Sequence, residues 1–189
     1  MNVGILVLAA GRAARFGADK RHALLPDGRT VLETTLANAR ASGLPLLVCV
    51  GEGDDALARH LLASDIVCIG CSRAAEGMGG TLAQAVCQLD GWEGALVALG
   101  DMPWVAPASF LAVAEQVAKD CIAVPVYESR RGHPVGFGSD FFSALAALGG
   151  DAGARRVLDA HPDRVRELPL ADAGIHRDID RPADLLAPG

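Results

Sequence analysis

The sequence predicts an α/β protein with a Rossmann-like three-layer α/β/α architecture and a mostly parallel sheet. Short apolar runs that are typical of strands alternate with longer segments of helical periodicity along the whole 189-residue chain. Several runs, such as residues 95–99 (ALVAL), are apolar at every position, which favours strands covered by helices on both faces. No repeat, linker or low-complexity segment interrupts the alternation, so we expect one domain over residues 1–189.

The apolar runs give the positions of the strands, and the segments with helical spacing of apolar residues give the helices. In chain order we expect strands at residues 3–8, 45–50, 65–69, 95–99, 121–126, 134–138 and 164–168. We expect helices at residues 31–42, 54–63, 80–89, 107–118, 139–147, 151–160 and 181–186. Ligands of such sheets bind beyond the carboxyl ends of the strands, so the residues just after each run are the candidates for function.

Charge and hydropathy exclude several classes of protein. The formal net charge is −6, and Lys/Arg blocks are absent apart from the N-terminal loop and the pair Arg155 and Arg156, which argues against nucleic-acid binding. No apolar run approaches the length of about 18 residues that spans a membrane, and no basic segment precedes an apolar one at the N-terminus. We therefore expect a cytoplasmic protein that binds neither nucleic acid nor membrane.

The five cysteines include a C-x-x-C pair, Cys68 and Cys71. A structural zinc needs a second pair of ligands, whereas Cys49, Cys87 and Cys121 stand alone. A thioredoxin-like site needs its pair at the start of a helix, whereas Cys68 belongs to an apolar run that predicts a strand. We expect the cysteines to be small buried hydrophobic side chains in a reducing compartment.

The opening segment VGILVLAAGRAARFGADK combines residues with very small side chains and cationic residues. Three residues of little side-chain bulk follow the strand: Ala9, Ala10 and Gly11. Three cations follow them: Arg12, Arg15 and Lys20. With Asp19 as the only carboxylate, the segment suits a polyphosphate. Its glycine spacing fits neither a Walker A loop nor the dinucleotide pattern G-x-G-x-x-G, and a surface loop with incidental cations is the alternative.

A carboxylate follows the strand at residues 95–99. In the stretch ALGDMP, Asp101 lies just past the end of that strand, and Pro103 fixes the turn. This position points a hard oxygen ligand into the crevice that the opening loop faces, and Mg²⁺ is the cation that suits it. The alternative is that Asp101 caps the helix that begins near Pro107.

A second acidic motif, HRDIDRPADL, lies near the C-terminus. In an extended backbone, Asp178 and Asp180 point to one side and Ile179 to the other, which gives one more metal ligand and a supporting acid. Pro182 suits the first turn of a short helix. The alternative is that Asp180 serves only as the N-cap of that helix.

These motifs resemble those of the MobA-like nucleotidyltransferases, which have the nucleotide-diphospho-sugar transferase fold. From Leu8 the opening loop reads L-A-A-G-x-x-x-R-F-G-x-x-K, like the loop that wraps the triphosphate in that family, and Asp101 matches the metal-binding aspartate of its D-x-P motif. The C-terminal motif is similar to the family's D-I-D-T-P-E-D-L, with Arg181 and Ala183 at the departures. The resemblance implies Mg²⁺ held by Asp101 and Asp180. It also implies that the catalytic residues are Arg12, Arg15, Lys20 and Asp101.

Three further segments extend the resemblance. EGMGGTLAQAV is similar to the G-M-S-x-S-L segment of molybdenum-cofactor cytidylyltransferases, and RRGHPVGF and GDAGARRVL resemble the family's R-G-H-P-V-x-F and G-D-x-G-A-R-x-x-L. The first implies that helix N-terminal amides at Gly79 and Gly80, with Thr81, hold the base or ribose. In the second, the residues that face the second substrate are Gly132, His133 and Pro134, although a lone histidine in a turn is often structural. In the third, Asp151 would cap a helix and Arg155 would reach substrate phosphate.

The resemblance implies CTP:molybdenum cofactor cytidylyltransferase activity, in which a molybdopterin phosphate takes CMP from CTP and pyrophosphate is released. Ala10 favours cytidylyl over guanylyl transfer, because guanylyl members of the family usually have L-A-G-G. The implied partners are a nucleoside triphosphate and a phosphorylated pterin, with a molybdoenzyme or its chaperone as the recipient of the product. The alternatives are another phosphorylated acceptor such as a sugar phosphate, guanylyl transfer, an NAD(P)H-dependent reductase that uses Cys68 and Cys71, and a regulator that binds nucleotide without turnover.

Overall fold

The protein is described by a computed structural model that covers residues 1–11, 16 and 19–186. Its strands are β1 (Val3–Leu8), β2 (Leu46–Gly51), β3 (Val67–Cys71), β4 (Gly94–Leu99), β5 (Ile122–Tyr127), β6 (Arg130–Arg131), β7 (Val135–Gly138) and β8 (Val165–Pro169). Its α-helices are α1 (Val31–Ala41), α2 (Asp55–Ala63), α3 (Met78–Val86), α4 (Pro107–Gln116), α5 (Phe142–Ala146) and α6 (Arg155–Ala160). Short 3₁₀ helices lie at Lys20–His22, Ser72–Glu76, Ser139–Phe141, Gly150–Ala152, Pro162–Arg164, Ala173–His176 and Pro182–Leu185.

The strands of the described chain form a mixed sheet in the order β3-β2-β1-β4-β7-β5-β6, with β8 paired to β5. The pairs β3 with β2, β2 with β1, β1 with β4 and β5 with β8 are parallel. β7 runs antiparallel to both β4 and β5, and β6 runs antiparallel to β5. β1 is central because its residues Ile5, Leu6 and Val7 are apolar and fully buried on both faces.

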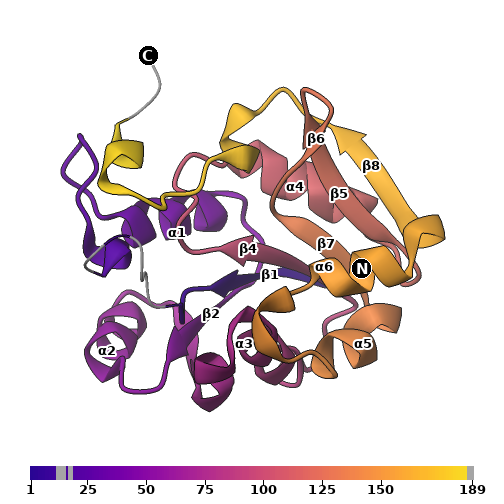
Figure 1. The fold of residues 1–189 in the computed structure, drawn as a ribbon, viewed down its shortest axis with the longest axis horizontal. Coiled ribbons are helices and arrows are strands. Elements are labelled where there is room, and N and C mark those ends of the chain that lie inside the picture. The colour runs from indigo at the N-terminus through magenta and orange to yellow at the C-terminus, as the bar shows by residue number, and fades with distance from the viewer. Residues whose placement is uncertain (12–15, 17–18, 187–189) are drawn as a thin grey trace.

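Helices cover both faces of the sheet, as Figure 1 shows for α1 and α4 on one side and α3 and α5 on the other. Side chains alternate along β1, so that Ile5 and Val7 join one apolar cluster and Leu6 joins the other. The first cluster contains residues of α1, α2 and α4, and the second contains residues of α3, α5 and α6. This three-layer α/β/α arrangement confirms the fold predicted from the sequence. None of the helices in the described part of the chain is long and apolar enough to cross a membrane.

The strand predictions hold at all seven positions within two residues, whereas three helix predictions need correction. The segment expected at 139–147 is a 3₁₀ turn followed by the short helix α5, and the one at 181–186 is a 3₁₀ helix. The helix expected at 151–160 begins only at Arg155, because Gly153 has a positive φ of 50° that ends the preceding turn. β6 was not predicted, since two exposed arginines after a turn carry no apolar signal.

Candidate functional site

A cavity of about 960 Å³ opens at the carboxyl ends of the parallel strands. The last residues of β1, β2, β3 and β4, or the residues just after them, line it: Leu8, Gly51, Cys71 and Leu99. This is the place that open α/β sheets use for ligands. Residues from far apart in the chain also meet here: Lys20, Thr81, Asp101, Asp151, Asp178 and Asp180.

The turn after β1 forms one wall of the cavity through Leu8, Ala9, Ala10 and Gly11. Ala9 is held tightly, because its backbone N–H donates to the carbonyl of Cys49 and a Cβ at Gly100 would lie only 3.0 Å from its methyl group. This contact with Gly100, just after β4, explains the small side chain at Ala9, whereas a Cβ added at Gly11 would meet no atom within 4 Å. Arg12 and Arg15 lie outside the described residues.

Lys20 lies between two carboxylates at the floor of the cavity. Its Nζ is 2.5 Å from Oδ2 of Asp101 and 3.3 Å from Oδ1 of Asp180. Burial alone would lower the pKa of Lys20, but the ion pairs with Asp101 and Asp180 outweigh it and raise the pKa above the usual value. The three residues singled out by separate sequence motifs therefore form one charged cluster.

Asp101 has an oxygen atom that the described residues do not satisfy. Its Oδ1 is buried and has no hydrogen-bond partner among them. An unpaired buried carboxylate oxygen is costly, and a divalent cation bound to it would remove that cost. The described residues offer no cluster of three His, Cys, Asp or Glu side chains around one point. Asp101 and Asp180 therefore fit Mg²⁺ as a pair of protein ligands, with the remaining positions left for substrate phosphates and water, which is how Mg²⁺ is usually held.

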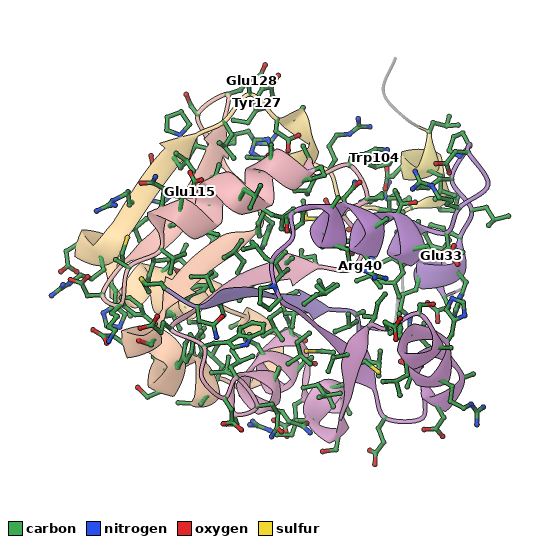
Figure 2. All side chains as sticks on the ribbon, turned by 180° about the vertical axis from the view of Figure 1, so that it is seen from behind. Glu33, Arg40, Trp104, Glu115, Tyr127 and Glu128 are labelled. Carbon is green, nitrogen blue, oxygen red and sulfur yellow. The ribbon has the colours of Figure 1, made fainter. Side chains whose placement is uncertain are left out.

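The C-terminal acidic segment is fixed to the turn after β4. The backbone N–H of Ile179 donates to the carbonyl of Asp101 at 3.0 Å, and the Ile179 side chain is fully buried against Leu25 and Val31. On the outer side, the guanidinium of Arg177 lies 4.6 Å from the ring centre of Trp104, which is labelled in Figure 2. These contacts bring Asp178 and Asp180 to the same cavity as Asp101.

Neither capping alternative describes the two acids. The helix α4 begins after Ala106, and the carboxylate that accepts from Ala106 N–H and from the Ser109 hydroxyl belongs to Asp172 rather than Asp101. The 3₁₀ helix at Pro182–Leu185 begins after Arg181, so Asp180 is not its N-cap. Instead, the carboxylate of Asp184 accepts from the backbone N–H groups of Asp180 and Arg181 at 3.0 and 2.7 Å.

Arg21 is a structural residue of the site that the sequence did not single out. It is buried, its side chain donates three bonds to Asp19 and two to Asp54, and it also donates to the carbonyl of Ala9 at 2.9 Å. Asp54 in turn accepts from Gly51 N–H at 2.9 Å. The Arg21 bonds lower the pKa of both Asp19 and Asp54. This network connects the backbone beside Lys20 to the ends of β1 and β2. In the sequence, the local signal for it was a basic residue directly after Lys20.

The glycine-rich start of α3 forms the opposite wall. Gly77 has a φ of 107°, and it lines the cavity with Met78 and Thr81. Gly79 and Gly80 are buried behind this wall, because a Cβ on either would lie within 2.8 Å of backbone oxygen of Gly150 or Arg73. Their predicted role is thus limited to backbone amides, and close packing alone explains why both are glycine. The hydroxyl of Thr81 donates to the carbonyl of Gly77 at 3.4 Å.

The remaining predicted residues lie beside the cavity. Gly132 packs against Ile175, and the backbone N–H of His133, which precedes Pro134, donates to the Ile175 carbonyl at 2.9 Å. Removal from water lowers the pKa of His133, against the opposing charges of Asp101 and Asp178.

Arg155 is not brought to the cavity. Its side chain is 88% exposed on α6, and its closest ion pair is with Asp159 at 3.8 Å. The expected cap of that helix is also corrected, since α6 begins after Ala154 and no side chain caps it. Asp151 lies in the preceding 3₁₀ turn and lines the cavity instead.

Comparison with known proteins decides the family. The model of the MobA-like NTP transferase domain matches residues 5–165, which covers most of the chain. The chain belongs to the MobA-like NTP transferase family. A solved structure of Rv0371c from Mycobacterium tuberculosis is similar to this member, with a TM-score of 0.81 and 31% identity over 97% of this chain and 94% of that chain. A manganese complex of Rv0371C from the same organism gives a TM-score of 0.79 and 29% identity over 97% and 96% of the two chains.

A curated relative shares part of this NTP transferase's sequence. The bifunctional protein GlmU of Cupriavidus necator is 33% identical over 138 residues, which are 72% of this chain and 30% of that protein. The chain therefore spans under a third of the length of that relative. The family match shows an NTP transferase domain over residues 5–165, and the small-residue turn after β1, Lys20 and Asp101 lie together in one cavity of that domain.

Proposed function

We propose that this nucleotidyltransferase is a CTP:molybdenum cofactor cytidylyltransferase that transfers CMP from CTP to a molybdopterin phosphate and releases pyrophosphate. The observation that supports transfer to a phosphate is the joint position of the turn at Leu8–Gly11, Lys20 and the Asp101–Asp180 pair around one cavity. Two polyanions that react with each other need cations and backbone amides around them, and this cavity brings such groups together. A cytoplasmic, single-domain enzyme with a molybdoenzyme or its chaperone as recipient of the product belongs to the same proposal.

The reaction in this cavity is a direct displacement at phosphorus. An oxygen of the acceptor phosphate forms a bond to the α-phosphorus of CTP, the bond between that phosphorus and the α,β-bridging oxygen breaks, and pyrophosphate leaves with the electron pair. Mg²⁺ bound by Asp101 and Asp180 would supply charge neutralisation of the phosphate oxygens and alignment of the triphosphate. Lys20 and the amides of Ala10 and Gly11 bind the phosphates, and Arg12 and Arg15 of the same loop are proposed to do so. No side chain acts as a covalent nucleophile.

Selection of cytosine is proposed to come from two walls of the cavity. Ala10, which is 7% exposed and lines the cavity, reduces the room beside the base by one methyl group. The start of α3 offers backbone amides at Gly79 and Gly80 next to Thr81, and hydrogen bonding there gives the larger part of the preference. The methyl group contributes only about 1 kcal/mol.

The acceptor is proposed to approach along Gly132, His133 and Pro134. The charges of Asp101 and Asp178 act on the pKa of His133, and this is the observation that supports such an approach. Arg155 takes no part, given its exposure and its pairing with Asp159. The cysteine pair gives no support to a thioredoxin-like reductase, because Cys68 and Cys71 lie on the strand β3 and not in a helix.

A screen of the four nucleoside triphosphates tests the proposal. The purified protein is incubated with Mg²⁺, one nucleotide and either molybdopterin or a sugar 1-phosphate, and pyrophosphate and the dinucleotide product are measured. We expect equal amounts of pyrophosphate and cytidine dinucleotide with CTP and molybdopterin only. Turnover with a sugar phosphate or with GTP would reject the assigned substrates, and oxidation of NAD(P)H without pyrophosphate would reject nucleotidyl transfer.

A further inference from the structure

The ammonium group of Lys20 lies beside the Oδ1 of Asp101 that no described residue pairs, where a divalent cation would bind. It is 2.5 Å from Oδ2 of Asp101 and 3.3 Å from Oδ1 of Asp180, and the Lys20 and Asp101 side chains are only 15% and 20% exposed. A divalent cation on Oδ1 of Asp101 and on Asp180 would lie next to this ammonium, and the repulsion between the two cations in a partly buried site amounts to several kcal/mol. Lys20 and a metal ion at Asp101 and Asp180 therefore exclude one another in this arrangement.

The backbone next to Lys20 is fixed, whereas its side chain has four rotatable bonds. Arg21 is held by Asp19, by Asp54 and by the carbonyl of Ala9, so residues 19–21 do not need to move when the site changes its contents. Rotation of the Lys20 side chain alone can take the ammonium away from Asp101 and toward the turn at Leu8–Gly11, which lines the same cavity. A triphosphate bound at that turn would offer the ammonium a new anionic partner.

From these two observations we propose that Lys20 is an internal counterion that keeps the Asp101–Asp180 pair closed to divalent cations until a nucleotide is present. The triphosphate draws the ammonium away from the carboxylates and brings its own oxygen ligands, so that metal and nucleotide enter together. The part that concerns nucleotide rests on the proposed nucleotidyl transfer. The exclusion of metal by Lys20 does not, since it follows from the contacts of the free protein.

The low number of protein ligands supports this order of binding. The described residues provide no three-membered cluster of metal-binding side chains, so a metal ion without nucleotide would have Asp101, Asp180 and water. Such a site is weak by itself, and the ion pair with Lys20 weakens it further. In the complex with nucleotide, the phosphates add metal ligands and Lys20 leaves the carboxylates. Metal and nucleotide therefore strengthen each other's binding.

Binding of Mn²⁺ to the free protein tests the proposal without any turnover. Free Mn²⁺ is measured by electron paramagnetic resonance during titration of the wild-type protein, Lys20→Met and Lys119→Met. Lys119 is a matched control, because it is an exposed lysine whose nearest ion pair is with Glu93 at 4.0 Å. We expect Lys20→Met to bind one Mn²⁺ at least about tenfold more tightly than wild type, and Lys119→Met to bind like wild type.

A double variant tests where the ion binds, and a folding measurement tests whether each variant is folded. The double variant Lys20→Met/Asp101→Asn should lose the gain in Mn²⁺ affinity, and circular dichroism with thermal unfolding shows whether each variant is folded. In the wild-type protein, a non-hydrolysable CTP analogue should tighten Mn²⁺ binding, and it should do so less in Lys20→Met. If folded Lys20→Met binds Mn²⁺ no more tightly than wild type, or if its gain survives Asp101→Asn, the proposal is overturned.

The nucleotide arm separates this inference from the proposed function. Should CTP have no effect while another nucleotide tightens Mn²⁺ binding, the assignment of CTP fails and the role of Lys20 stands. Should Lys20→Met be folded and unchanged in Mn²⁺ affinity while the enzyme turns over CTP, the role of Lys20 fails and the proposed function stands. If Lys20→Met does not fold, the wild-type arm decides alone, and equal Mn²⁺ affinity with and without each of the four nucleotides would overturn the proposal.

Discussion

Ile179 and Asp101 are joined by a hydrogen bond of 3.0 Å from the backbone N–H of the first to the carbonyl of the second. The bond places the neighbours of Ile179, Asp178 and Asp180, beside the aspartate that follows β4. Of these two acids, Asp180 contacts Lys20 together with Asp101. The pairing of Asp101 with Asp180 therefore rests on a backbone contact between segments that are remote in the sequence.

This geometry predicts different roles for the two neighbouring acids. Asp180→Asn should raise the Mg²⁺ concentration needed for half-maximal activity by about 10- to 100-fold, because a metal ligand or its partner is lost. Asp178→Asn, a matched change two residues away on the same cavity, should alter it only a few fold. Titration of activity with Mg²⁺ measures both. The reverse order of effects would assign the metal to Asp178 instead.

Lys20→Ala should lower kcat/KM for the nucleotide by about 30- to 1000-fold, because a cation that faces phosphate in a water-poor site contributes about 2 to 4 kcal/mol. The protein should stay folded, since Lys20 is at the surface of the cavity and not in either apolar cluster. Steady-state kinetics at saturating acceptor measure the effect. An unchanged kcat/KM in the folded variant would remove the phosphate-binding role from this lysine.

The Arg21 network predicts a loss of stability and a change in its pH dependence. Arg21→Gln should lower the free energy of unfolding by about 2 to 4 kcal/mol, because Asp19 and Asp54 lose a buried partner. Arg29→Gln is the control, because Arg29 pairs with Asp27 on the surface, where such a pair contributes less than about 1 kcal/mol. Urea unfolding at neutral pH compares the two variants with wild type.

The sign of the pH dependence follows from the lowered pKa values of Asp19 and Asp54. A carboxyl whose folded pKa is below its unfolded value contributes stability that is fully present above the unfolded pKa and is lost as pH falls through the folded pKa. Wild type should therefore lose stability steeply below about pH 4, and Arg21→Gln should show a shallower loss there. Equal slopes for the two proteins would contradict the assigned cause.

Base selection gives a prediction about Ala10. Wild type should prefer CTP to GTP, and Ala10→Gly should reduce that preference by no more than about tenfold, because one methyl group contributes about 1 kcal/mol. Competition between the two nucleotides in one reaction measures the ratio directly. A preference for GTP in the wild type would reject cytidylyl transfer, and complete loss of selectivity in Ala10→Gly would reject the role given to the start of α3.

Much of the fold was predictable because apolar content marks each buried strand. The strands and their alternation with helices follow from local patterns, and the ends of β1 and β4 pointed directly to Leu8–Gly11 and Asp101. Contacts between remote segments were not predictable. Nothing in the sequence indicates that Arg21 binds Asp54, since no local pattern links residues 33 positions apart.

The interpretation of two local motifs depends on packing that the sequence does not show. The motif around Arg155 suggested a phosphate contact, but the turn at Gly150–Gly153 directs α6 so that Arg155 faces solvent. The glycines at 79 and 80 leave room for backbone of the neighbouring segments, and the predicted role of their amides in ligand binding stays a prediction. A single sequence does not distinguish glycine required by packing from glycine required by a ligand.

In the proposed function, the cavity at Asp101 and Lys20 transfers a nucleotidyl group to a phosphate. The most direct measurement follows CTP radiolabelled at the α-phosphorus in the presence of Mg²⁺ and molybdopterin, for wild type and Asp101→Asn. We predict that wild type moves the label to the acceptor with one pyrophosphate per transfer, and that Asp101→Asn is slower by at least about 100-fold. Label that stays on free CMP or CTP in wild type, or wild-type transfer by Asp101→Asn, would contradict the account.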